Sequence, residues 1–243
     1  MDQFLNMERF MRSFKKYLLV VLISFAALEA DDSGIYEYEI RFKNKIGPFS
    51  IDGLKTFSKK EKGFGVMFYG KNRILNAEII QESEFDLTNS RVFPKYYIQH
   101  VKMPIKGQQN QNITFDYKNR KIASSGDINW VISFLTDDIP MDPISSGFQI
   151  RQNLKSGIEE FEINLIKLDE GTFASNSFKV IDSEILKIKD VNYPCKVLER
   201  TDEKGGKSLY YVAETLDFIL IKVNDERKER KILIEAEKIL SFG

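Results

Sequence analysis

The sequence predicts a mainly β protein, an antiparallel half-barrel or barrel-like sheet with one or two short helices inserted mid-chain. From about residue 34 onwards apolar and polar side chains alternate with a period of two, which is typical of strands that bury one face. These alternating runs are short and are separated by turn-forming clusters, for example at 43–45 and 202–206. Short strands with frequent turns favour an antiparallel sheet, a barrel or a sandwich over alternating βαβ units.

The first feature along the chain is an uncharged apolar segment, residues 17–27. Basic residues precede it (Arg9, Arg12, Lys15 and Lys16), and small residues and Glu29 follow it. A secretory signal peptide has three parts: a basic N-terminal region, a short apolar stretch and a region of small residues at the cleavage site. A membrane-spanning helix would need about 20 apolar residues, so this segment is short for an anchor. We therefore expect residues 1–30 to be a signal peptide, with an uncleaved anchor as the alternative. We expect residues 31–243 to form a single β-rich domain in the periplasm. This domain would contact the membrane only through the leader or transiently.

The first expected strand, 35–43, shows the alternation most clearly. Tyr36, Tyr38, Ile40 and Phe42 share one face, and charged side chains occupy the other. Further strands are expected at 49–58, 63–69, 78–85, 96–101, 112–117, 161–165, 173–180, 193–200, 208–214, 218–223 and 231–239. Several of these, such as 218–221, are apolar on both faces, so we expect something to cover their outer side. The charged run 225–231 alternates in sign and is typical of a solvated turn or strand edge.

One segment departs from the period of two. Asp142 and Pro143 precede apolar residues at helical spacing, and Gly157 follows them. An acid at the N-cap, a proline at the first helical position and a glycine beyond the end predict a helix. Residues 129–135 (NWVISFL) are a candidate for a second short helix.

Composition excludes several function classes. Lys and Arg total 36, Asp and Glu also total 36, and this balance gives no electrostatic reason to bind nucleic acid. His100 is the only histidine and Cys195 the only cysteine, so a catalytic Cys–His pair or serine triad would have to use these single residues. No Gly-x-Ser-x-Gly motif is present, and a histidine- or cysteine-based metal site would need more ligands. We expect no disulfide within the chain, no metal, no cofactor and no enzymatic activity, and we attribute Asp142 to helix capping rather than to a cation site.

The helix segment carries a recognisable motif. Asp142, Ser145, Phe148 and Arg151 fit the pattern Asp, hydrophobic, Ser, aromatic, hydrophobic-Arg. Four other features agree with this motif: a tyrosine-rich first strand, Val-Phe-Pro at 92–94, Phe-Asp at 115–116, and a Tyr-Tyr, Asp, Leu-Ile series near the C-terminus. The proline expected near Leu220 is missing. On these residues the chain resembles a bacterial family of periplasmic proteins, domain of unknown function number three-one-zero-eight. The resemblance implies a half-barrel or barrel with helices between strands, similar to envelope carriers of lipids and lipoproteins. No activity is attached to that family, so no catalytic or binding residue is carried over.

Two features bear on function. Arg151 lies about two turns into the predicted helix, where it would pair with a carboxylate on the sheet and pin the helix, or alternatively bind a ligand head group. The 19 Phe and 10 Tyr, placed largely on alternating strand positions, would either fill the inside of a curved sheet or line a cavity for an apolar ligand such as an acyl chain. We therefore expect an exported cell-envelope protein that binds or carries a lipid or lipoprotein. The alternatives are an envelope scaffold that docks another protein, and a hydrolase that uses carboxylates the sequence does not single out.

Overall fold

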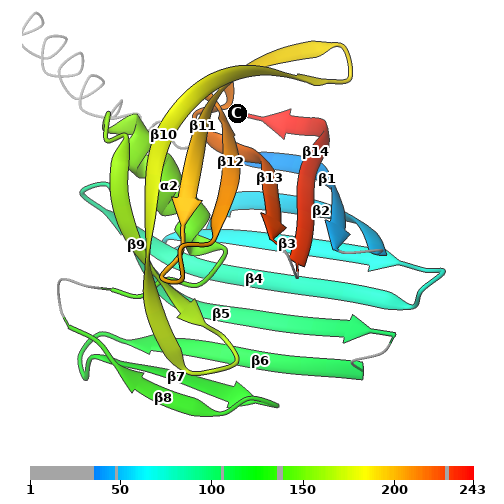
Figure 1. Cartoon of the computed structure of the whole chain (residues 1–243). Helices are drawn as coiled ribbons and strands as arrows, with labels where there is room; N and C mark the ends of the chain where they lie inside the picture. The colour runs from blue at the N-terminus through cyan, green and yellow to red at the C-terminus, as the bar shows by residue number, and fades with distance from the viewer. Residues whose placement is uncertain (1–35, 47–48, 105–106, 136–138, 228–229) are drawn as a thin grey trace, which may run out of the picture. The chain divides into compact units, whose positions relative to one another are not determined.

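One antiparallel sheet of 14 strands contains most of the described chain (Figure 1). The computed structural model describes residues 36–46, 49–104, 107–135, 139–227 and 230–243. The strands follow one another across the sheet as β8-β7-β6-β5-β4-β3-β2-β1-β14-β13-β12-β11-β10-β9. The predicted mainly β, antiparallel fold is therefore confirmed.

The sheet consists of two meanders in which each strand pairs with the next one in the sequence. The first contains β1 Tyr38–Ile46, β2 Phe49–Lys59, β3 Phe64–Asn72, β4 Ala77–Thr88, β5 Arg91–Met103, β6 Gly107–Asp116, β7 Lys121–Gly126 and β8 Trp130–Ser133. The second contains β9 Glu160–Lys167, β10 Thr172–Ile188, β11 Val191–Thr201, β12 Lys207–Ala213, β13 Ile219–Arg227 and β14 Arg230–Phe242. The first and last strands join the meanders, because β1 pairs with β14 from Tyr38↔Phe242 to Ile46↔Ile232.

A helix, α2 (Ser145–Lys155), connects the two meanders and packs on strands of both. It contacts β4 and β5 of the first meander and β9 and β13 of the second, and Figure 1 shows it inside the curve of the sheet. Eight of its 11 residues are buried, so the sheet encloses the helix on more than one face. A short 3-10 helix, η1 (Glu214–Leu216), lies between β12 and β13.

The edge strands β8 and β9 do not pair with each other in the described part of the chain, so the sheet is an open half-barrel. Other contacts cover the gap. The strand-like residue Met141 bridges to β9, where its N–H donates to the Asn164 carbonyl (2.8 Å) and its carbonyl accepts from the Ile166 N–H (3.0 Å). The indole of Trp130 on β8 donates to the carbonyl of Leu168, just beyond β9 (2.8 Å). Met141 thereby satisfies part of the β9 edge, and Trp130 satisfies the Leu168 carbonyl just beyond it.

Two elements differ from the sequence prediction. Residues 129–135, a candidate helix, contain strand β8 instead, and strand β7 was not predicted. Trp130 and Ile132 pack against a cluster of buried residues, here called the core cluster, while Val131, between them, is 64% exposed. The core cluster consists of Tyr97, Ile113, Ile122, Phe134, Ile139 and Ile166. This two-residue alternation is the period of a strand, and the aromatic and β-branched residues favour it. The sequence segment was too short to distinguish the two periods.

The predicted signal peptide, 1–30, lies outside the described residues. Among the residues that the structure does describe, no helix has the length and apolar character needed to cross a membrane.

Candidate functional site

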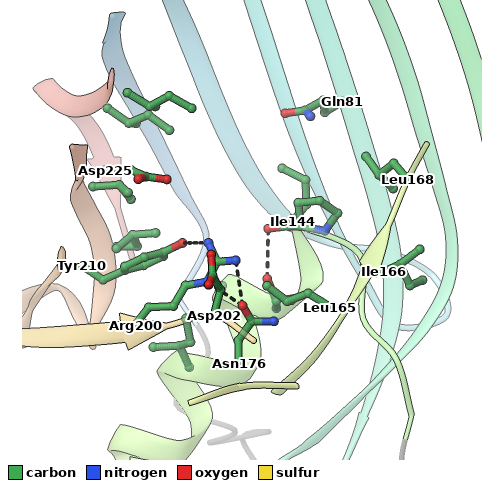
Figure 2. Close-up of a pocket in the computed structure, with 18 of the residues that line it drawn as sticks. Gln81, Ile144, Leu165, Ile166, Leu168, Asn176, Arg200, Asp202, Tyr210 and Asp225 are labelled. Atoms are coloured by element: carbon green, nitrogen blue, oxygen red, sulfur yellow. Dashed lines mark hydrogen bonds between the residues drawn. The ribbon is translucent and has the colours of Figure 1, made fainter. Parts of the chain in front are cut away.

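A cavity of about 730 Å³ lies between α2 and the inner faces of both meanders (Figure 2). Most of its wall is apolar. The apolar lining comes from β1, β3, β4 and β5, from α2, and from β9, β10, β13 and β14: Phe42, Phe68, Ile79, Val101, Ile144, Ile150, Leu165, Ile166, Phe178, Leu220, Val223, Ile232 and Ile234. The alternation that defines the strands therefore also builds the cavity, because every second side chain points to the same face of a sheet.

The helix leaves this space open on one side. Gly147 lines the cavity, and a Cβ placed there would have no heavy atom within 4 Å. Phe148, the next residue, packs into an aromatic cluster, with ring centroids 5.0 Å from Phe57 and 4.8 Å from Phe85. The helix thus anchors one face in the core with a large ring and presents its smallest residue to the cavity.

Asp142 holds the N-terminal end of the helix. Its carboxylate is fully buried and accepts hydrogen bonds from the backbone N–H groups of Ile144 (2.8 Å) and Ser145 (2.9 Å), as an N-terminal capping residue does. The hydroxyls of Ser145 (2.6 Å) and of Ser83 on β4 (2.9 Å) also donate to it. Burial raises the pKa of Asp142 above its ordinary value, and these hydrogen bonds oppose that shift. The helix itself begins at Ser145, so Pro143 lies in the preceding turn.

Arg151 holds the helix to the second meander. Its side chain is 2% exposed, and its Nε donates to the carboxylate (3.0 Å) and to the carbonyl (2.9 Å) of Asp217, between η1 and β13. Its Nη2 also donates to that carboxylate, and Lys155 contributes a further ion pair at 2.9 Å. The guanidinium lies 5.1 Å from the ring centroid of Phe148, a cation–π contact. Arg151 therefore pairs with a carboxylate in the turn before β13 and does not line the cavity.

A third polar anchor was not predicted. Gln149 accepts a hydrogen bond from the backbone N–H of Val92 (2.8 Å) and donates to the carbonyl of Ser90 (3.2 Å), at the β4–β5 turn. Gln149 is 8% exposed. A polar residue that stays buried on a helix must find such partners, but the sequence does not say which ones.

The polar part of the cavity wall was also not predicted. Arg200 on β11 donates from Nε (3.0 Å) and Nη2 (2.8 Å) to the side-chain oxygen of Asn176, and from Nη1 to the hydroxyl of Tyr210 (3.3 Å). Figure 2 shows these three side chains converging on one side of the cavity. The available signal was their position: Arg200 and Asn176 occupy the same alternate positions as the buried Leu198 and Phe178. Polar residues on the inward face of a strand are informative for that reason.

Gln81 occupies the other side of the cavity (Figure 2). Its amide nitrogen donates to the hydroxyl of Tyr97 (2.9 Å) and to the side-chain oxygen of Gln99 (3.2 Å), and Tyr97 donates to Gln99 (2.8 Å). Burial, and after it the charge of Asp142, raises the pKa of Tyr97 above its ordinary value. These hydrogen bonds join side chains of the neighbouring strands β4 and β5.

The remaining sequence candidates lie apart from the cavity. A ring nitrogen of His100 on β5 is 2.6 Å from the side-chain oxygen of Asn110, and the thiol of Cys195 on β11 contacts the Tyr193 carbonyl at 3.2 Å. Neither residue lines the cavity. No three His, Cys, Asp or Glu side chains of the described residues are grouped so as to hold a metal ion.

The fold and the cavity together define the class of protein: an open β-barrel-like domain with a largely apolar interior cavity. Eight chains of solved structures match it. One is a β-barrel-like protein of the domain of unknown function DUF1849 from Brucella abortus, with a TM-score of 0.53 and 7% sequence identity over 84% of this chain and 96% of that chain. At this identity the likeness is one of fold. No family model matches the sequence, and no curated protein does.

Proposed function

We propose that this protein is an exported cell-envelope protein that binds an apolar, lipid-like ligand in the cavity beside α2. The cavity carries the proposal: about 730 Å³ lies within the range of ligand pockets, about 300–1,000 Å³, and its wall is mostly apolar. An acyl chain is the ligand chemistry that suits such a lining, because each buried methylene contributes about 0.8 kcal/mol.

The cellular location rests on the sequence. The basic, apolar and small-residue segments in 1–30 have the order of a signal peptide, and the motif from Asp142 to Arg151 resembles periplasmic family three-one-zero-eight. Both support a periplasmic location.

Gly147 offers a direct test of ligand binding. Gly147→Phe would place a ring in the cavity, whereas Gly147→Ala would add one methyl group where no atom lies within 4 Å. The measurement is titration with the neutral apolar dye N-phenyl-1-naphthylamine, whose fluorescence rises in an apolar site. We expect saturable binding to the unmodified protein and to the alanine variant, and at least about ten-fold weaker binding to the phenylalanine variant, a loss of about 1.4 kcal/mol.

The alanine variant also controls for folding. Replacing glycine by alanine inside a helix stabilises it by about 0.5–1 kcal/mol, so Gly147→Ala should unfold at slightly higher urea concentration. Dye that fails to saturate the unmodified protein, or that binds the phenylalanine variant equally well, would contradict the proposal.

A second candidate function is docking of another envelope protein. The hairpin of β10 and β11 carries three exposed apolar side chains, Ile181 (50%), Ile185 (68%) and Val191 (52%). Exposed apolar groups on a strand pair are a common feature of protein-binding surfaces. In-cell crosslinking from a residue near Ile185 should then recover a protein partner, and Ile185→Lys should abolish that crosslink.

A further inference from the structure

Arg200 gives the cavity a chemically distinct side. Its hydrogen-bonding partners, the Asn176 side-chain oxygen and the Tyr210 hydroxyl, are neutral, so neither cancels its charge. The three hydrogen bonds use three of the five N–H groups of a guanidinium. Arg200 is therefore a cation held in a fixed position in a cavity whose wall is mostly apolar.

Asn176 fixes that position. It is 2% exposed, and its amide nitrogen donates to the Ala174 carbonyl at 2.9 Å, which turns its oxygen toward Arg200. Because the guanidinium is oriented before any ligand arrives, little side-chain entropy is lost when an anion binds. This is a preorganised site rather than a flexible surface arginine.

We propose that the ligand of this cavity is an anionic single-chain amphiphile whose head group binds at Arg200 while its chain lies along the apolar wall. This inference rests on the proposed function. The carboxylates of Asp202 and Asp225 also line the cavity, as do the amino groups of Lys55 and Lys204. Lys167, Glu170 and Glu203 line the cavity as well, and Lys167 forms ion pairs with both glutamates. We place the head group at Arg200 because two neutral side chains, Asn176 and Tyr210, fix the orientation of its guanidinium.

The test is competition against N-phenyl-1-naphthylamine by four C16 compounds that differ only in the head group. Hexadecanoic acid and hexadecyl phosphate are anionic, and methyl hexadecanoate and hexadecan-1-ol are neutral. The anionic compounds are used below their micelle-forming concentrations and the neutral ones below their solubility limits. We expect at least one anionic compound to displace the dye at concentrations about ten-fold lower than the neutral ones. Preference for the acid assigns a carboxylate head group and preference for the phosphate assigns a phosphate monoester; either supports the inference.

Two variants locate the head group. Arg200→Gln should reduce the preference for the anion to about two-fold or less, whereas Lys204→Gln, which removes a positive charge from the same cavity, should keep it. Equal displacement by hexadecanoic acid, hexadecyl phosphate and methyl hexadecanoate would overturn the inference without requiring any variant to fold. Retention of the preference by Arg200→Gln would also overturn it. Absence of saturable dye binding would instead overturn the proposed function itself.

Discussion

A buried arginine is stable only when its charge is compensated. Arg151 is 2% exposed and depends on Asp217, which accepts hydrogen bonds from its guanidinium through the carboxylate and the main-chain carbonyl. Removing one partner of a buried ion pair leaves the other charge without compensation, and this typically costs about 3–5 kcal/mol. The stability of the helix position therefore depends strongly on Asp217.

Asp217→Asn should lower the free energy of unfolding by about 3 kcal/mol. Asparagine tolerates the left-handed backbone at this position (φ +53°), so the substitution removes charge without straining the turn. Lys155→Met is the matched control, because it removes a second cation paired with the same carboxylate, but one that is 24% exposed; we expect a loss under about 1 kcal/mol. Urea unfolding measures both, and equal losses would show that burial of Arg151 is not the cause.

Asp142 should make stability depend on pH. Burial raises its pKa in the folded state, so the folded protein binds the proton more tightly than the unfolded chain does, whose Asp pKa is about 3.9. The stability that this group contributes is present below about pH 4 and is lost as pH rises through the folded-state pKa. Asp142→Asn keeps an acceptor for the N–H groups of Ile144 and Ser145 but cannot ionise.

The comparison is therefore between the unmodified protein and Asp142→Asn in urea, from about pH 4 upward. We expect the stability of the unmodified protein relative to the variant to fall as pH rises. A difference that stays constant or grows with pH would mean that the four hydrogen bonds, rather than burial, decide the pKa of Asp142.

At this scale the sequence predicted the identities of the residues better than their partners. Asp142 and Arg151 were recognisable from helix-end chemistry and spacing, and both are buried where the helix meets the sheet. Their partners Ser83 and Asp217 lie 59 and 66 residues away, and no local rule relates such positions. Arg200 was missed for the same reason, because the inward face of its strand becomes visible only when the sheet is assembled.

At the scale of elements, a contact between β8 and the β9–β10 turn connects the two edges of the open sheet. Gly171 in that turn has φ +65°, and a Cβ there would lie 2.4 Å from Cγ of Trp130. Side chains larger than hydrogen are thus excluded both by backbone conformation and by the indole ring. The turn can pack against Trp130 in this way only with glycine at position 171.

Gly171→Ala should therefore push the β9–β10 turn away from the indole ring of Trp130. Gly205→Ala is the matched control, since Gly205 has a similar φ of +77° but a Cβ there would have no atom within 4 Å. The control should lose about 1 kcal/mol from backbone strain alone, and Gly171→Ala about 2 kcal/mol or more because the ring must also move. Trp130 is the only tryptophan, so its emission should shift to longer wavelength in Gly171→Ala and stay unchanged in Gly205→Ala. Identical spectra and equal stability losses would show that this contact does not help to connect the two edges.

Clear alternation of apolar and polar residues predicted most of the strands. At the edge of the sheet this alternation is weak, and strands β7 and β8 were not predicted from it. Strand β8 is four residues long and β7 is six, so neither shows enough turns of either period to be identified from sequence. Their strand conformation comes from the pairing of β7 with β6 and of β8 with β7, and from the packing of Trp130 and Ile132 on the core cluster. Tertiary contacts decided what local preference left open.

At the scale of the whole described unit, α2 ties the two meanders together. Asp142 and Gln149 fasten the helix to β4 and β5, and Arg151 fastens it to the second meander through Asp217. The β1–β14 ladder adds a second junction between chain segments almost 200 residues apart. Neither meander can keep its inner face buried once the other has left, so we expect the unit to unfold in one cooperative step.

The chain contains two natural reporters for this expectation. Trp130 lies on the last strand of the first meander, and Cys195, the only cysteine, is fully buried on β11 of the second. Burial raises the pKa of the Cys195 thiol to about 11, so the thiol should react with a labelling reagent only after unfolding. In a urea titration the fluorescence of Trp130 and the labelling of Cys195 should give the same midpoint, as a two-state transition requires. Asp217→Asn should move both midpoints down together. Cys195 labelling at urea concentrations that leave Trp130 fluorescence unchanged would show instead that the second meander opens independently, and that the helix does not couple the two halves.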